Sequence, residues 1–241
     1  MKLDALSIVA ILWVLSRMGG RASPPSPPGP KPLPPQGVSP WSDDEMRAFI
    51  DTVNPIVGAT VFALNVYQVE SGNNPRAINP KGGAAGLAQV MPQYLPHYGW
   101  TAGGPAFANS GVRGQLPVIA QLLLDQVKQI GGRPQKVATL YHANFFPKTL
   151  GKAYVVRRKD KGGDYEEDTA YQWNKALDAN RDGVIDEGDL DAVLTKARAS
   201  STYRALAAQM ERLADEPPVV AVAALPAKGK PVKLKPMQAK G

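Results

Sequence analysis

The chain has 241 residues, 44% of them hydrophobic, and a formal net charge of +7 at pH 7. The surplus of basic residues lies in residues 1–40 and 227–241, and the chain between them is close to neutral. This distribution argues against a nucleic acid-binding core. The sequence has no cysteine, which excludes disulfides, thiolate metal sites and cysteine nucleophiles.

The N-terminal part has two segments that differ sharply in composition. Residues 1–22 contain an apolar run from Ala5 to Leu15 between basic residues, which fits either a secretory signal peptide or an uncleaved membrane anchor. Residues 23–40 are mostly proline and predict an extended linker. Export followed by a stiff spacer suits a protein that acts on a polymer away from the membrane.

Helical periodicity begins after this linker, and no persuasive strand alternation follows. Ser42 and Glu45 have the spacing of a capping box, and the helix they start should end at Pro55. The sequence therefore predicts an all-α fold in three parts: residues 41–160 as the main domain, 161–215 as a further helical region, and 216–241 as a disordered tail rich in lysine, proline and alanine. Further helices are expected at about 56–70, 112–130, 134–143, 166–177, 187–199 and 202–214.

Glu70 is the first candidate for catalysis. It ends a helix whose preceding residues are nearly all apolar, so its carboxyl should leave the core at the edge of a cleft. Apolar walls disfavour the charged form of a carboxylate, so such a glutamate can stay protonated near neutral pH and act as a general acid toward a glycosidic oxygen. A glutamate at a helix end is more often a solvated surface charge, so position alone does not decide.

Two motifs follow from Glu70 onward. Their residues are Glu70, Ser71, Asn74, Pro75, Ala77, Gly83, Ala84, Gly86, Leu87, Gln89, Met91 and Pro92. At these positions the sequence resembles the soluble lytic transglycosylase family, in which a Glu-Ser pair ends the catalytic helix and a Gly-Leu-Met-Gln run ending in Met-Pro follows. Ala88 stands where the family has methionine. The resemblance favours a catalytic role for Glu70.

A third family motif, Ala-Tyr-Asn, falls on residues 140–144. Tyr141 matches the family tyrosine, and His142 stands where asparagine is usual. His142 directly follows Tyr141 and so points to a different face of the helix, which favours a packing or solvated role over a catalytic one.

The resemblance implies a lysozyme-like helical transglycosylase domain that cleaves peptidoglycan glycan strands between N-acetylmuramic acid and N-acetylglucosamine. In this family the C6 hydroxyl of the muramoyl residue replaces water and closes a 1,6-anhydro ring, and no cofactor is required. Glu70 would act first as acid and then as base. The implied location is the cell envelope, periplasmic or membrane-anchored through the N-terminal segment, or a phage virion.

Three further residues are expected at the substrate. Ser71 would orient Glu70 or contact the glycan, or else cap the helix; Gln89 would bind an N-acetyl or ring substituent, or else tie down its loop. Tyr141 would orient Glu70 or donate to the sugar as charge develops, or else belong to the core. Aromatic residues just past the second motif could stack on sugar faces or belong to the core, namely Tyr94, Tyr98 and Trp100.

An acidic loop in the C-terminal region carries a separate signal. Its spacing matches the twelve-residue EF-hand loop, with a glycine at the sixth position and flanking helices on both sides. We expect one structural Ca²⁺ that clips the C-terminal helices together, bound weakly because Asp189 replaces the longer glutamate at the last position. The expected ligands are Asp178, Asn180, Asp182, Val184 through its carbonyl, Asp186 and Asp189.

Two other functions compete with the transglycosylase. A hydrolytic muramidase of the goose-lysozyme type would need a second carboxylate to activate water. A non-catalytic wall-binding or virion structural protein could keep the fold, and the departures at Ala88 and His142 give this reading some weight. The candidates for the second carboxylate are Asp125, Asp160, Asp164 and Glu166.

Overall fold

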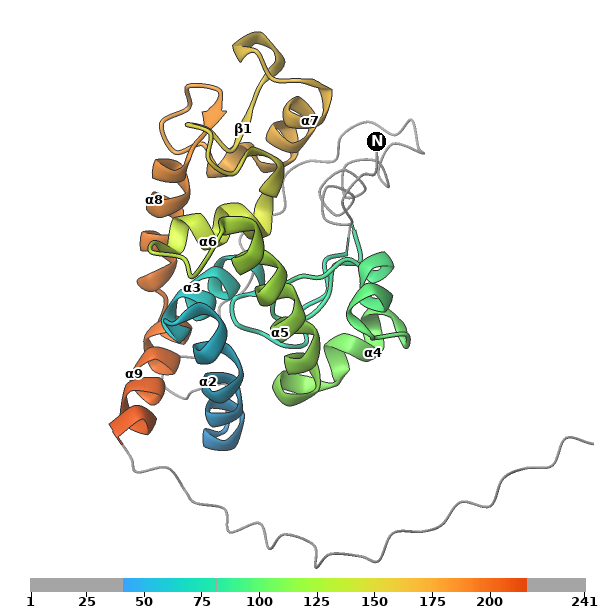
Figure 1. The fold of residues 1–241 in the computed structure, drawn as a ribbon, viewed down its shortest axis with the longest axis vertical. Coiled ribbons are helices and arrows are strands. Elements are labelled where there is room, and N and C mark those ends of the chain that lie inside the picture. Colours follow the sequence, from blue (N-terminus) through green and yellow to red (C-terminus); the bar gives the residue numbers. More distant parts are fainter. Residues whose placement is uncertain (1–40, 81, 216–241) are drawn as a thin grey trace, which may run out of the picture.

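The computed structural model describes residues 41–80 and 82–215 (Figure 1). The described chain is mainly helical, as the sequence predicts. The predicted signal peptide or anchor at 1–22, the linker at 23–40 and the tail at 216–241 lie outside the described residues.

The first two helices form a sharply bent pair that leads to Glu70. Helix α2 (Asp43–Val57) starts with the predicted capping box, in which Ser42 and Glu45 bond to each other's backbone N–H. The predicted end at Pro55 is wrong. A proline in the last turn keeps a helical φ and costs only one backbone hydrogen bond, so the helix continues until Gly58, whose φ of 77° stops it. Helix α3 therefore starts at Thr60 and runs to Ser71.

The middle of the chain, from η1 to η2, is helical. A 3₁₀ helix, η1 (Pro92–Tyr98), is followed by α4 (Gly103–Asn109) and by the long helix α5 (Gly111–Ile130), close to its predicted limits. Helix α6 spans Val137–Phe145, later than the predicted 134–143, and η2 (Pro147–Thr149) follows it.

The C-terminal part contains two short strands that the sequence did not predict. Strand β1 (Val156–Arg157) pairs antiparallel with β2 (Val184–Ile185), with Val156 opposite Ile185. Two-residue strands are too short to show alternation, which is why the all-α expectation missed them. The other elements, in chain order, are η3 (Lys159–Lys161), α7 (Tyr165–Asn174), η4 (Lys175–Leu177), α8 (Glu187–Arg198) and α9 (Ser201–Asp215).

One hydrophobic core extends through both parts of the chain, from Trp41 to Leu213. Helix α3 lies among α2, α6, α8 and α9, while α5 packs on α2 and α6 (Figure 1). Gln209 on α9 donates to the carbonyl of Trp41 at 3.1 Å, which joins the two ends of the described chain. The last helices thus brace the helix that carries Glu70.

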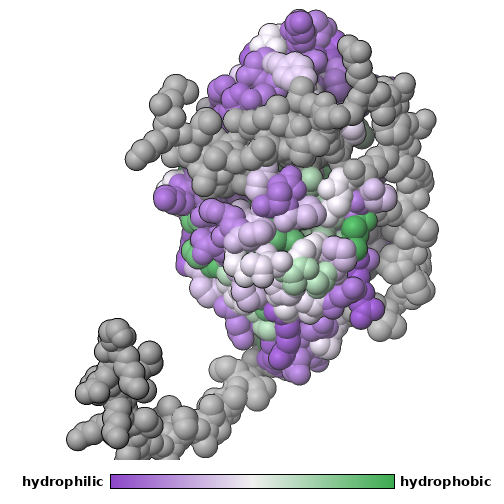
Figure 2. Space-filling model, turned by 90° about the vertical axis from the view of Figure 1, so that its right-hand side faces the viewer, coloured by the Kyte–Doolittle hydropathy of each residue, from purple (hydrophilic) through white to green (hydrophobic). Residues whose placement is uncertain are grey.

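The surface is mixed in character on the face shown in Figure 2. Hydrophilic side chains predominate at its upper end, the region of η3 and α7, and hydrophobic ones appear in patches on the middle. Within the described residues, no single helix is long and apolar enough to cross a membrane. Helices α2 and α3 meet that criterion only as a pair bent by 109°, and both contribute residues to the core.

Candidate active site

A cavity of about 920 Å³, its open mouth included, contains the Glu70 side chain. Its walls come from α3, the loop after α3, η1, α5, α6, η2 and α7. The lining residues are Glu70, Ala88, Gln89, Val90, Met91, Tyr94, Tyr98, Leu122, Gln126, Tyr141, Ala143, Asn144, Phe145, Pro147 and Asn174.

Glu70 reaches this cavity because α3 is a buried helix that ends there. Seven residues of α3 are buried, and Gly72, with a φ of 67°, turns the chain away directly after Ser71. The Glu70 side chain is half-buried at the cavity wall. The predicted position of Glu70, at the edge of a cleft, is confirmed in the structure.

The amide of Asn144 holds Glu70, and the amide of Gln126 holds Asn144 in turn. Nδ2 of Asn144, on α6, donates to Oε1 of Glu70 at 3.0 Å. Nε2 of Gln126, on α5, donates in turn to Oδ1 of Asn144 at 2.8 Å. Because Gln126 is buried and occupies the amide oxygen of Asn144, the NH₂ group of Asn144 is the end that faces Glu70.

Two buried tyrosines, Tyr67 and Tyr141, have raised pKa values, in part because of the charge of Glu70. Burial, and secondly the negative charge of Glu70, raise the pKa of Tyr67 and of Tyr141 far above the ordinary value of a phenol. Both phenols are therefore neutral at physiological pH. Tyr141 lines the cavity, as predicted for a substrate-site residue, whereas the hydroxyl of Tyr67 is buried below it without a hydrogen-bond partner.

The second motif forms a tight loop whose backbone is fixed from within. Gly86 has a φ of 76°, and a Cβ there would lie 2.5 Å from Oε1 of Gln115, so only glycine fits. That same oxygen accepts from the N–H of Leu87 at 2.8 Å. The loop delivers Gln89 to the cavity, with its Nε2 donating to the carbonyls of Gly86 at 2.9 Å and Ala77 at 3.3 Å.

Ser71 does not join the cavity. It is 5% exposed, and its hydroxyl donates to the carbonyl of Tyr67 at 3.0 Å, which is the helix-end role that the sequence left open. Gln89 combines both of its predicted environments, since it lines the cavity while its amide nitrogen ties down the loop.

His142 points away from the cavity, on the face that its place after Tyr141 predicts. It is buried, with Nδ1 3.4 Å from Oε1 of Glu187 on α8 and Nε2 3.0 Å from Oγ1 of Thr149. Burial lowers the pKa of His142 although the neighbouring Glu187 carboxylate acts in the opposite direction. His142 thus links α6 to α8 in the C-terminal part.

Of the three aromatic candidates for sugar stacking, two face the cavity. Tyr94 and Tyr98 line it, and burial raises the pKa of each to about 12. Trp100 is not among the lining residues; it packs edge-on against Phe107 with ring centroids 5.4 Å apart.

The candidates for a second carboxylate all lie outside the residues that line the cavity. Asp125 is 3.9 Å from Nε2 of His97, and Asp160 bonds to Arg158 at 2.7 Å. Asp164 and Glu166 both bond to Lys148. Within the described chain, Glu70 is the only carboxylate side chain that lines this cavity.

The acidic loop lies apart from the cavity, between η4 and α8. Asp186 caps α8 and exchanges hydrogen bonds with Asp189, and Asp189 also accepts from the N–H of Ala179 at 3.0 Å. No group of three or more histidine or acidic side chains in the described ranges is arranged to hold a metal ion. The buried Asp178 has one carboxylate oxygen, Oδ1, without a hydrogen-bond partner.

Sequence reasoning missed three polar residues of the cavity: Gln126, Asn144 and Asn174. Asn144 stands within the third motif, two positions after His142, so its distance of three from Tyr141 on a helix was the available signal that both face one way. Gln126 and Asn174 lie outside the recognised motifs, and nothing in the sequence distinguishes them from surface amides.

Comparison with known proteins agrees with this geometry. Residues 58–149 match the family model described as the transglycosylase SLT domain, so this part of the chain is similar to that domain. No curated protein and no solved structure matches the chain. The comparisons give no evidence for an EF-hand. The matched range includes Glu70, Gln89, Tyr141 and Asn144 and ends before α7.

Proposed function

We propose that this chain, through its transglycosylase SLT domain, cleaves the β-1,4 bond between N-acetylmuramic acid and N-acetylglucosamine in peptidoglycan and leaves a 1,6-anhydromuramoyl end. The SLT domain itself suggests lytic transglycosylase activity on peptidoglycan and a place in the cell envelope. The observation that carries the finer proposal is a cavity of the described chain in which Glu70 is the sole carboxylate and is held by an asparagine amide.

Glu70 supplies both proton transfers. In the first step the protonated carboxyl gives its proton to the glycosidic oxygen, so that the bond from the muramoyl C1 to that oxygen breaks. In the second step the muramoyl C6 oxygen bonds to C1, and its proton passes to the Glu70 carboxylate. The atoms balance without water, and the enzyme returns to its starting protonation state.

The hydrogen bond from Asn144 to Oε1 makes the two oxygens of Glu70 unequal. Oε1 accepts an N–H from Asn144, and the carbonyl oxygen of a carboxylic acid is a better acceptor than its hydroxyl oxygen. The transferable proton therefore sits on Oε2. When the proton leaves, the same N–H donates to a carboxylate, a stronger hydrogen bond that stabilises the charge as it develops.

The internal nucleophile is preferred over water because the described cavity offers no second carboxylate. A hydrolase needs a general base or nucleophile across the sugar from the acid. Asp125, Asp160, Asp164 and Glu166 all have other partners outside the cavity. A C6 hydroxyl already attached to the substrate reacts intramolecularly, so it needs less activation than a free water molecule.

Mass spectrometry of fragments released from purified peptidoglycan tests this function. The full chain should release anhydromuramoyl products, and Glu70→Gln should release none. The matched control is Asp51→Asn, which neutralises an exposed acid on α2 and should keep the activity. Reducing-end products would establish a hydrolase instead, and absence of release by a folded parent would favour the wall-binding or structural role.

We further propose that the loop at 178–189 binds Ca²⁺ as a structural ion. The support is the spacing of oxygen ligands and the buried, unpartnered Oδ1 of Asp178. The ion would be held by Asp178, Asn180, Asp182, the Val184 carbonyl, Asp186 and Asp189, several of which accept backbone N–H bonds in the structure described here. Weak binding is expected because Asp189 replaces the longer glutamate at the last position of the loop.

Thermal unfolding tests the ion. Because a ligand that binds only the folded state stabilises it, Ca²⁺ should raise the Tm of the parent relative to EDTA. Asp182→Ala should remove this increase, and Asp191→Ala, an exposed acid outside the loop, should keep it. An unchanged parent Tm at millimolar Ca²⁺ would remove the ion from the proposal without affecting the transglycosylase.

A further inference from the structure

We propose that α7, which lies outside the range that matches the family model, forms one wall of the glycan-binding site, with Asn174 binding a polar substituent of the sugar. The inference rests on the proposed function. Its starting observation is that Asn174 lines the same cavity as Glu70, 104 positions away in the chain. The range that matches the family model ends at residue 149.

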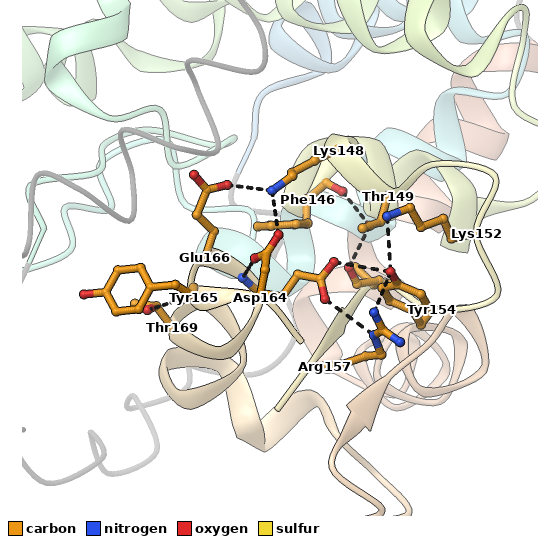
Figure 3. Close-up of polar contacts among 12 residues, drawn as sticks. Phe146, Lys148, Thr149, Lys152, Tyr154, Arg157, Asp164, Tyr165, Glu166 and Thr169 are labelled. Carbon is orange, nitrogen blue, oxygen red and sulfur yellow. Dashed lines mark hydrogen bonds and ion pairs between the residues drawn. The ribbon is translucent and has the colours of Figure 1, made fainter. Parts of the chain in front are cut away.

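The N-terminus of α7 is fastened to the segment that forms the cavity wall. Nζ of Lys148 lies 2.9 Å from Oδ2 of Asp164, the N-cap of α7, and 2.8 Å from Oε2 of Glu166 (Figure 3). Lys148 directly follows Pro147, which lines the cavity. One side chain therefore sets the distance between the helix and the wall.

A second contact fixes the inner face of α7. Glu167 is 3% exposed and accepts from Nε of Arg157 at 3.4 Å and from the hydroxyl of Tyr154 at 3.3 Å. The guanidinium of Arg157 lies 3.8 Å above the Tyr154 ring, and the two residues face each other in Figure 3. A buried carboxylate with these partners is costly to displace, so α7 is a fixed wall of the cavity.

Asn174 has the hydrogen-bonding groups that an N-acetyl sugar requires. Its Nδ2 donates to the carbonyl of Ala170 at 2.9 Å, which orients the amide along the helix. An amide has two N–H donors and an oxygen acceptor, so one donor and the acceptor remain for a ligand. N-acetyl and hydroxyl substituents present the complementary acceptors and donors.

Steady-state kinetics on peptidoglycan glycan strands without stem peptides tests the wall. Asn174→Ala should raise KM about three- to tenfold, the size of one lost contact, and change kcat by less than about twofold. Gln172→Ala removes an exposed amide of the same helix and should leave both constants unchanged. An unchanged KM for Asn174→Ala would overturn the inference.

Binding to a catalytically inactive chain separates this inference from the proposed activity. In the Glu70→Gln background, calorimetry with the same glycan strands should show the same three- to tenfold weakening for Asn174→Ala, with Gln172→Ala unchanged. If the parent cleaves nothing but this loss of affinity is found, the wall is supported and the activity fails. If glycan does not bind, or binds equally to all variants, the wall is refuted.

Discussion

The side-chain amide of Asn144 donates to Oε1 of Glu70 across 3.0 Å, and this bond joins the ends of two helices that are 74 positions apart in the chain. It crosses the cavity wall from α6 to α3. The orientation of one amide thus determines whether a donor or an acceptor faces the proposed catalytic acid. Two predictions depend on that orientation.

Replacement of Asn144 should slow the chemical step. Asn144→Ala removes the donor to the developing carboxylate, and loss of one such donor typically costs a factor of about 10 to 1,000 in kcat. Asn144→Asp, which has the same shape, should cost at least as much because it places a second carboxylate against Glu70. The rate of anhydromuramoyl release at saturating peptidoglycan measures the effect. A kcat within a factor of two of the parent for both variants would contradict the assigned role.

Gln126 should act as a positioning residue through Asn144. Gln126→Leu removes the donor that fixes the Asn144 amide, so kcat should fall by roughly three- to tenfold, the equivalent of about 1 kcal/mol. Gln126→Glu should lose more, because its carboxylate attracts the Asn144 NH₂ group and turns the amide oxygen toward Glu70.

The pH profile distinguishes positioning from simple loss of stability. A turned amide places its oxygen against Glu70, so Gln126→Glu should shift the acid limb of kcat against pH, whereas a purely structural defect lowers the whole curve. The exposed amide Gln121, on the same helix, is the matched control as Gln121→Leu. Equal profiles in all variants would leave Gln126 with only a structural role.

The sequence predicts those features that depend on local pattern. The place of Glu70 at a helix end, the capping box at Ser42 and the limits of α5 follow from periodicity and motifs, and the structure agrees with each. Contacts between distant amides leave no such pattern. Gln126 reaches the cavity only because α5 packs on α6, and Asn174 only because α7 is held by Lys148 next to the cavity. A single sequence does not specify that packing.

Loss of the ion pairs that Lys148 makes with Asp164 and Glu166 should loosen α7 without disturbing Glu70. Lys148→Met keeps most of the apolar stem and removes the charge, so its two partners, Asp164 and Glu166, lose their shared cation. We expect KM for glycan strands to rise about two- to fivefold with little change in kcat, because partly exposed ion pairs contribute at most about 1 kcal/mol. Lys196→Met, which removes the charge of an exposed lysine on α8, is the matched control. A fall in kcat with unchanged KM would show that these ion pairs act on chemistry and not on the wall.

Protonation of His142 should destabilise the joint between α6 and α8. Burial lowers the folded-state pKa of His142 below its ordinary value of 6.5, despite the opposing pull of Glu187. Protons then bind the unfolded chain more readily, so this contribution to stability is complete above pH 6.5 and is lost as the pH falls through the lower folded-state pKa. The Tm of the parent should therefore fall more steeply between pH 7 and pH 5 than that of His142→Asn. Glu187→Gln should steepen the fall further, because it removes the group that favours the imidazolium. Parallel Tm curves for the parent and both variants would mean that His142 does not change its protonation on unfolding, and the joint would then depend on packing alone.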